Sequence, residues 1–228
     1  MPDPAYKFDF APPGADQITK QLTLRATHYN AHKAVPQQTG IPLLARDGTV
    51  IGPKMSPADW CKGSMEGTLI VNDGQSRTVY NHGGQSAEMH VDCRLHGYPN
   101  HPNLGKNRWK VTEAPLGEGV FKMHLVAFRT IAIDNAQPFI SYRSVVYIQS
   151  ARGLPVTLPD GTVVTHDGYF YSADTGEMVG GHIDVFVGDR DHNPFPFIKG
   201  RNGATFPAQL INNPAISQHM AEIHRSVV

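Results

Sequence analysis

The sequence predicts a mainly β protein with a few short helices. The 228 residues include 22 Gly and 18 Pro, which interrupt regular elements and therefore favour many short ones. Only 18% of the residues are charged, below the quarter that soluble domains usually carry. The apolar segments, such as 125–128, have the length of strands, and none approaches the length of a membrane-spanning helix. The chain is long enough to bury a sizeable core.

Tight turns separate the expected strands. Four Asp-Gly pairs lie next to short apolar segments, and this dipeptide suits the positive φ angles of hairpin turns. The pairs begin at Asp47, Asp73, Asp160 and Asp167. The predicted strands are 22–29, 67–71, 121–133, 145–148, 162–166, 169–173 and 183–187.

Two helices are predicted from the signals at their ends. Ser56 can cap a helix that has Pro57 at its first position, with possible ends at Gly63 and Gly67. The second helix is expected at about 214–227, after the cap signal Asn213-Pro214.

The chain is expected to fold as one domain after a loosely held arm. Residues 1–18 are rich in Pro, Asp and Ala and lack apolar periodicity, so the domain is predicted to span 19–228. No apolar segment typical of a signal peptide follows Met1. The compartment is therefore left open between the cytosol, a secreted chain that has been trimmed, and export by another route.

Charge and cysteine content limit the partners. Twenty basic residues match twenty acidic ones, and without a basic excess the chain is not expected to bind nucleic acid. The two cysteines, Cys61 and Cys93, could form a disulfide in an oxidising compartment or remain two buried thiols. The residues alone leave both alternatives open.

Two clusters with possible chemistry have simpler explanations. A histidine-rich stretch could hold zinc, but its spacing fits no compact ligand pattern, so solvated loop histidines are favoured. Cys61 could act as a nucleophile with His90 as its base, yet its position beside Trp60 favours the core. The histidine-rich stretch contains His82, His90, Asp92, His96 and His101.

A third cluster consists of two acids around a glycine-rich turn. Asp184 lies between Ile183 and Val185, so strand alternation points its side chain away from both. If Asp184 faces a cleft, burial and the like charge of Asp174 would raise one of the two pKa values, as protonation of a glycosidic oxygen requires. The alternative is an aspartate that binds backbone amides in a turn.

Three separated blocks then resemble one family. The segments 173–176 (Ala-Asp-Thr-Gly) and 181–186 (Gly-His-Ile-Asp-Val-Phe) are similar to the signature of the three-aspartate domain, found in lytic transglycosylases of the membrane-bound A type. The segment 128–134 (Phe-Arg-Thr-Ile-Ala-Ile-Asp) resembles the stretch with the first aspartate. The resemblance runs from about Arg25 to Gly188, and the segment between the last two aspartates is one residue shorter than in the family.

The resemblance implies a fold and a site. The fold would be a six-stranded double-psi β-barrel with an inserted subdomain at about 40–120 and an open groove for glycan chains. Asp134, Asp174 and Asp184 would be the three aspartates, with Asp184 as the catalytic acid. Candidates for lining the glycan site are Tyr29, Tyr171 and His182, each of which could equally be a packing residue.

The same resemblance implies an activity. The protein would be a peptidoglycan lytic transglycosylase that acts on glycan strands in the periplasm or outside the cell, as a monomer and without metal or organic cofactor. One carboxyl group would protonate the leaving oxygen and then deprotonate the C6 hydroxyl of N-acetylmuramic acid, which closes a 1,6-anhydro ring. The alternative is a non-catalytic, expansin-like module that binds wall glycan.

Overall fold

A computed structural model describes residues 7–134, 136, 139–200 and 202–225. The chain divides into two compact units, each considered by itself. The barrel unit joins the chain up to Tyr29 to residues 119–228, and the inserted unit spans residues 30–118. The insertion thus begins about ten residues earlier than the expected 40–120, because the segment after Asn30 pairs within the insertion.

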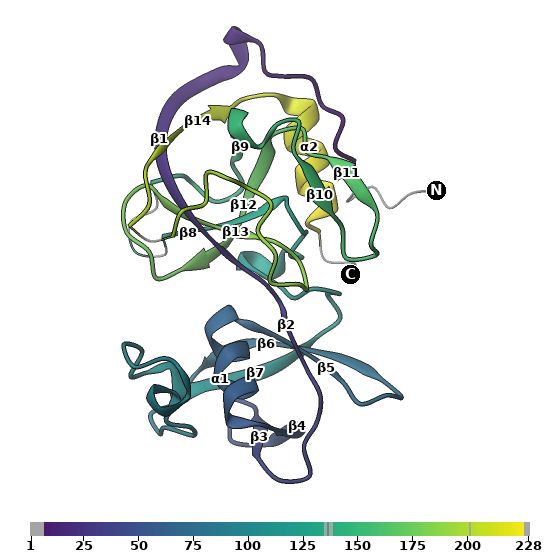
Figure 1. The fold of residues 1–228 in the computed structure, drawn as a ribbon, viewed down its shortest axis with the longest axis vertical. Helices are drawn as coiled ribbons and strands as arrows, with labels where there is room; N and C mark the ends of the chain where they lie inside the picture. The colour runs from purple at the N-terminus through teal and green to yellow at the C-terminus, as the bar shows by residue number, and fades with distance from the viewer. Residues whose placement is uncertain (1–6, 135, 137–138, 201, 226–228) are drawn as a thin grey trace. The chain divides into compact units, whose positions relative to one another are not determined.

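The barrel unit is built on a closed six-stranded barrel, which confirms the prediction of a mainly β fold (Figure 1). The strands follow one another around the barrel in the order β1-β13-β8-β12-β9-β14. The pairs β1–β13 and β8–β12 are parallel, and the other pairs are antiparallel. The strands are β1 (Ile18–Tyr29), β8 (Thr130–Asp134), β9 (Val145–Tyr147), β12 (Tyr169–Gly176), β13 (His182–Phe186) and β14 (Phe206–Ile211).

Strand alternation fills the barrel with apolar side chains. On β1, Leu22, Leu24 and Ala26 are buried, whereas the residues between them are more exposed. On β8 every residue is buried, including Ile131 and Ile133. Each fully buried aliphatic side chain of this size contributes about 1.5–3 kcal/mol, so the interior of the barrel holds the strands in one register.

The predicted strand 121–133 is correct only in its last part. Residues 130–133 belong to β8, but the segment before them is irregular, with a 3-10 turn at Val120–Lys122. Phe121 and Phe128 have φ angles of 55° and 60°, which no strand allows. Apolar composition predicted a strand here because periodicity cannot detect a change of backbone direction.

The first residues that the structure describes, from residue 7 onward, are fixed rather than loosely held; the rest of the expected arm lies outside the described residues. The ring of Phe8 lies under the guanidinium group of Arg129, 3.8 Å from its centre. The Phe10 N–H donates to Asp167 (3.2 Å), and the Tyr169 hydroxyl donates to the Ala11 carbonyl (2.8 Å). The expected arm therefore packs on the barrel from residue 7 onward.

A buried ion pair anchors this contact. Arg129 and Asp167 form two hydrogen bonds, of 2.6 and 2.9 Å, and the two side chains are 0% and 2% exposed. Burial alone would raise the pKa of Asp167, but the bonds and charge of Arg129 outweigh it and lower that pKa. Asp167-Gly168 is therefore not the predicted hairpin turn. This dipeptide lies between β11 (Val163–Thr165) and β12 and directs the Asp167 carboxylate into the protein interior. Strand β11 pairs with β10 (Pro155–Thr157) instead.

Both predicted helices form. The Ser56 side chain caps α1 (Pro57–Glu66) by accepting from the Asp59 N–H, and Gly67 ends it with a φ of +78°. Asn213 caps α2 (Pro214–Ile223), which ends four residues before the expected 227. Among the described residues, none of the helices has the length and apolar character needed to cross a membrane.

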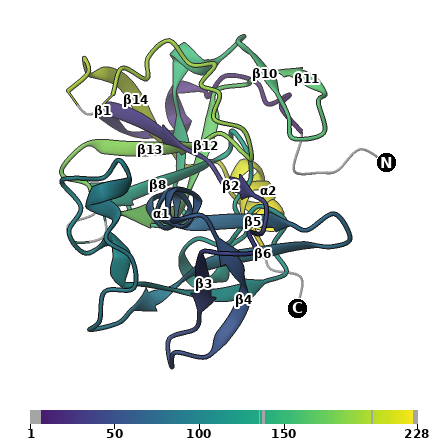
Figure 2. The same cartoon turned by 60° about the horizontal axis from the view of Figure 1, so that its bottom comes forward.

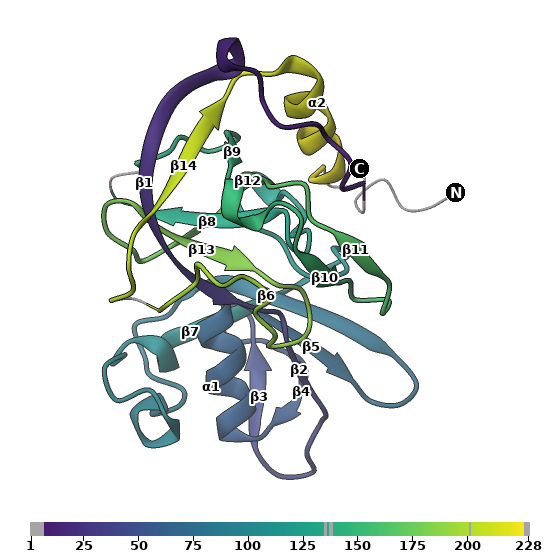
Figure 3. The ribbon, with the colours of Figure 1, turned by 45° about the horizontal axis from the view of Figure 1, so that its top comes forward.

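The inserted unit is a four-stranded sheet with a helix and a hairpin (Figures 2 and 3). The sheet order is β2-β5-β6-β7, and α1 packs on β2 and β5. Trp60 and Trp109 meet edge to face in its core, with ring centres 5.7 Å apart. Its strands are β2 (His32–Ala34), β3 (Ile41–Leu44), β4 (Val50–Met55), β5 (Thr68–Asn72), β6 (Arg77–Gln85) and β7 (Asn107–Thr112).

The structure joins Cys61 and Cys93 in a disulfide across 32 residues of the inserted unit. Closing a loop of this length restricts the unfolded chain by about 3–4 kcal/mol. We expect the double variant Cys61→Ala, Cys93→Ala to lose this amount in urea unfolding, and the oxidised wild type to lose it on addition of reductant. Unfolding curves that are identical with and without reductant would contradict the bridge.

Removing the Asp167 charge should be costly because it leaves Arg129 buried without its counterion. We expect Asp167→Asn to lose about 3–5 kcal/mol of unfolding free energy. The control is Asp160→Asn in the exposed turn between β10 and β11, with an expected loss below about 1 kcal/mol. Equal losses in the two variants would show that the buried pair does not anchor the arm.

Candidate active site

The three aspartates lie on one face of the barrel wall. Strand β8 runs between β12 and β13, and its Ala132 is in register with both Asp174 and Asp184. Residues paired across neighbouring strands point to the same side of a sheet, and so do residues two apart on one strand. Asp134, two residues beyond Ala132, therefore shares this side. We call the part of the wall with Asp134, Asp174 and Asp184 the acidic face.

An irregularity in β12 produces this alignment. Ser172 pairs with Ile131, and Asp174 pairs with Ala132, so the pairing skips one residue of β12. Such a bulge turns the following side chain to the other face of the sheet. Without it, alternation along β12 would not bring Asp174 beside Ala132.

Asp174 is held by two donors. The Tyr29 hydroxyl donates to Oδ2 (2.6 Å), and the Thr175 N–H donates to Oδ1 (2.8 Å). Both bonds favour the ionised form, but burial outweighs them and raises the pKa of Asp174 to about 6. The sequence predicted one raised pKa in this pair without choosing which. The structure assigns the raised pKa to Asp174, and its cause is burial.

Asp184 and Asp134 have different surroundings. Asp184 is half-buried in the middle of β13, paired with Ala132 on one side and with Thr27 of β1 on the other. Asp134 is buried at the end of β8, where its Oδ1 accepts the N–H of Ala136 (2.8 Å). Asp134 therefore holds the backbone N–H of Ala136, whereas Asp184 lies on a strand that is paired on both sides.

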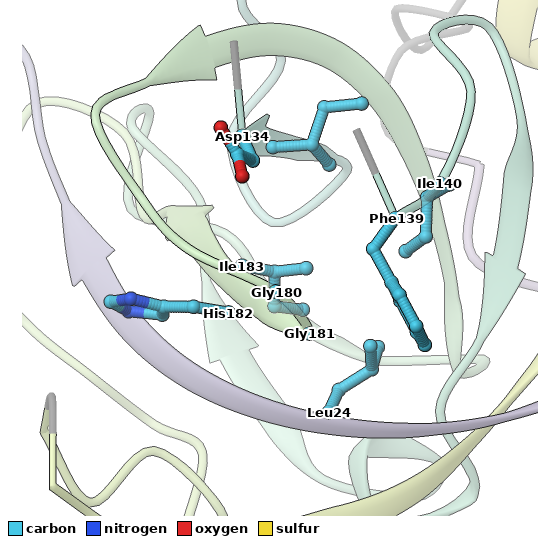
Figure 4. Close-up of a pocket in the computed structure, with 9 residues that line it drawn as sticks. Leu24, Asp134, Phe139, Ile140, Gly180, Gly181, His182 and Ile183 are labelled. Atoms are coloured by element: carbon cyan, nitrogen blue, oxygen red, sulfur yellow. The ribbon is translucent and has the colours of Figure 1, made fainter. Parts of the chain in front are cut away.

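A small hollow adjoins the acidic face (Figure 4). It is a shallow depression rather than a cavity, too narrow to enclose a water molecule, and Asp134 and His182 reach it from different strands. The His182 Nε2 lies 2.9 Å from the Thr27 hydroxyl. The other residues that line it are Leu24, Ile133, Phe139, Ile140, Gly180, Gly181 and Ile183.

Of the three residues expected to line the glycan site, two lie at the acidic face and one lies in the core. Tyr29 contacts Asp174 directly, and His182 lies two residues before Asp184 on the same face of β13. Tyr171 is 3% exposed and packs on His224, with ring centres 4.9 Å apart, within the apolar cluster that includes residues of α2. The ring of Tyr171 is therefore part of the core, and the prediction that it lines the glycan site is withdrawn.

Gly119 is a site residue that the sequence analysis missed. A Cβ atom at this position would lie 2.2 Å from the Ala173 carbonyl oxygen and 3.0 Å from Asp174 Oδ1. Gly119 thus lets the chain pass directly over Asp174. No local pattern signals this contact, because the two residues lie far apart in the sequence.

The two other clusters do not form the sites considered for them. The sulfur of Cys61 is bonded to Cys93 and is therefore not a nucleophile. His90 and Asp92 lie outside the strands; the His90 ring reaches the Pro42 carbonyl (3.2 Å), and Asp92 binds Arg94. Within the described ranges, no three His, Cys, Asp or Glu side chains gather as metal ligands would.

The raised pKa of Asp174 predicts a pH dependence of stability. A carboxyl group with a higher pKa in the folded chain stabilises folding when protonated. This contribution is complete below the ordinary aspartate value of 3.8 and is lost as the pH rises through about 6. Between pH 4 and 7, the wild type should therefore lose melting temperature relative to Asp174→Asn.

Asp73 provides a control of opposite sign. Backbone N–H groups of Ser76 and Gln75 lower its pKa, so its stabilising contribution disappears on acidification instead. A melting temperature difference between the wild type and Asp174→Asn that stays constant from pH 4 to 7 would contradict the assignment.

Comparisons with known proteins support the fold. No protein-family model matches the sequence, and no curated protein does either. Among solved structures, MltA of Escherichia coli with bound chitohexaose is 12% identical, with a TM-score of 0.56 over 84% of this chain and 72% of that one. The membrane-bound lytic murein transglycosylase of Agrobacterium tumefaciens is 14% identical, with a TM-score of 0.50 over 87% and 75%. The resemblance to the catalytic barrel of this family is thus confirmed at the level of the fold.

Proposed function

We propose that the protein is a peptidoglycan lytic transglycosylase that cleaves the β-1,4 bond between N-acetylmuramic acid and N-acetylglucosamine. The observation that carries this proposal is the shared register of Ala132 with Asp174 and Asp184. It puts two carboxyl groups with different surroundings on one face of a barrel. Two such groups are what acid catalysis at a glycosidic bond uses.

Asp184 is proposed as the single acid and base. Its proton moves to the glycosidic oxygen as the bond from C1 of N-acetylmuramic acid to that oxygen breaks. The resulting carboxylate then takes the proton of the C6 hydroxyl of the same sugar, and O6 bonds to C1. The products are a 1,6-anhydro end and a free hydroxyl on N-acetylglucosamine, and no water is consumed. Every proton is accounted for by one side chain, so the reaction requires no cofactor.

Asp174 is proposed to tune Asp184. Two carboxylates on one face repel each other, so a proton on either one favours the ionised state of the other. With a pKa of about 6, Asp174 changes charge near neutral pH. Tyr29 and the Thr175 N–H hold the orientation of its carboxyl group. Asp134 is proposed to support the same face through its bond to the Ala136 N–H.

The substrate follows from charge and from the compared structures. The formal net charge of zero places no electrostatic barrier before a long glycan. MltA, whose fold this chain shares, was solved with chitohexaose, a sugar chain. Glycan strands of peptidoglycan are therefore the proposed partner, and the protein is proposed to act on them as a monomer.

The proposed location is the periplasm or the cell exterior. Peptidoglycan lies outside the cytoplasm, and disulfides such as Cys61–Cys93 persist mainly in oxidising compartments. The proposed substrate and the disulfide thus both support a location outside the cytoplasm.

Loss of Asp184 should abolish lysis without unfolding the protein. We expect Asp184→Asn to release at least about 100-fold less anhydro-muropeptide from purified sacculi than the wild type, because the proton donor and acceptor is removed. Asp9→Asn, an exposed carboxyl group on the arm, is the control and should retain full activity.

The masses of the products separate this activity from its rivals. An anhydro product supports lytic cleavage, and a hydrated product would mean a hydrolase. No product with retained glycan binding would mean an expansin-like binding module. Full activity of a folded Asp184→Asn variant would remove Asp184 from the mechanism.

A further inference from the structure

The loop 119–123 holds Phe121 in left-handed backbone with its ring exposed to solvent. The loop is closed by two hydrogen bonds, from the Gly119 N–H to the Met123 carbonyl (2.8 Å) and from the Met123 N–H to the Val120 carbonyl (3.0 Å). Between them, Phe121 and Lys122 have φ angles of 55° and 58°. The side chain of Phe121 is 64% exposed.

Neither property of Phe121 helps the chain to fold. Bulky residues with Cβ atoms rarely adopt left-handed backbone, and an exposed ring gains little from burial. Strained residues of this kind concentrate at ligand clamps and active sites. The strain and the exposure of Phe121 therefore indicate a ligand-binding role.

Neighbouring side chains fix the ring in place. Tyr142 meets Phe121 edge to face, with ring centres 5.9 Å apart and planes at 88°. The guanidinium group of Arg143 lies 4.7 Å from the centre of the Phe121 ring. Arg143 itself has a φ of 65°, and its N–H donates to the Ser172 carbonyl (2.9 Å). Three of the four non-glycine residues with positive φ in the described chain thus meet at this spot.

This aromatic surface is connected to Asp174 of the acidic face. The Tyr142 hydroxyl and the Thr175 hydroxyl are 2.8 Å apart, and the Thr175 N–H donates to Asp174. At the other end of the loop, Gly119 passes directly over Asp174. Phe121 is therefore held beside the acidic face from two directions, through Tyr142 and through its own loop.

We propose that the surface formed by Phe121, Tyr142 and Arg143 is a subsite that stacks against one pyranose ring of the glycan strand. A pyranose has apolar C–H groups on its faces and hydroxyl groups at its edge. The exposed ring of Phe121 fits such a face, and the Arg143 guanidinium and Tyr142 hydroxyl offer polar partners to the edge. This inference rests on the proposed glycan substrate and adds a binding position that neither the three aspartates nor the hollow provides.

The test measures binding apart from catalysis. Chitohexaose is titrated into the Asp184→Asn variant by calorimetry, with and without a second substitution at position 121. Phe121→Asn removes the ring and suits left-handed backbone, so its melting temperature should equal or exceed that of the parent. We expect this substitution to weaken binding about threefold to tenfold. Phe121→Tyr retains the ring and should bind as the parent does.

Matched variants make the result specific. Val163→Ala truncates another exposed apolar side chain, 62% exposed on β11, and should leave the affinity unchanged. If Phe121→Asn fails to fold, Phe121→Gly serves in its place, because glycine relieves the left-handed backbone. In the catalytically active protein, Phe121→Asn should raise the KM for glycan strands by a similar factor.

The outcomes separate this inference from the proposed function. Normal lysis by the wild type, together with unchanged affinity in Phe121→Asn, overturns the stacking subsite and leaves the lytic activity standing. Binding that weakens in Phe121→Asn, together with no lysis by the wild type, supports the subsite and overturns the lytic activity. A wild type that neither binds chitohexaose nor lyses sacculi overturns both.

Discussion

The pairing of β8 with β12 on one side and β13 on the other is the constraint on which the candidate site depends. Ala132 stands in register with an aspartate on each neighbour, and the order of strands around the barrel permits no other strand between them. A shift of one residue in either pairing would turn one carboxyl group to the opposite face. The apolar interior of the barrel resists such a shift, because it would also turn Ile131 and Ile133 away from that interior. The stability of the core and the position of the acids are thus the same property of the fold.

The sequence predicted the strand orientation of Asp184 but not the environment of Asp174. Alternation around Asp184 correctly placed it on the face away from Ile183 and Val185, because period-two patterns survive in any regular strand. The position of Asp174 depends on a bulge at Ala173, which leaves no local signature in the sequence. The raised pKa of Asp174 depends on burial by residues far away in the chain. A sequence pattern can identify an aspartate as a candidate, but only the fold determines how far it is buried and therefore how far its pKa is raised.

Long-range contacts also explain the other differences. The arm lacked periodicity and was expected to be loose, yet Phe8 and Phe10 pack where Arg129 and Asp167 are buried. Tyr171 was a candidate for lining the glycan site or for packing, and it packs on His224 at the end of α2. In contrast, both helices followed their predicted caps, because capping is decided within four residues. Features determined locally were predictable, whereas features determined by tertiary contacts were not.

The central claim is that the acidic face is where a glycan bond is broken. The most direct measurement is a crystal structure of the Asp184→Asn variant with bound chitohexaose. The account predicts one glycosidic oxygen within hydrogen-bonding distance of the substituted side chain at position 184, with a neighbouring sugar ring on Phe121. A well-ordered sugar chain bound elsewhere, with no sugar near Asp174 or position 184, would contradict it.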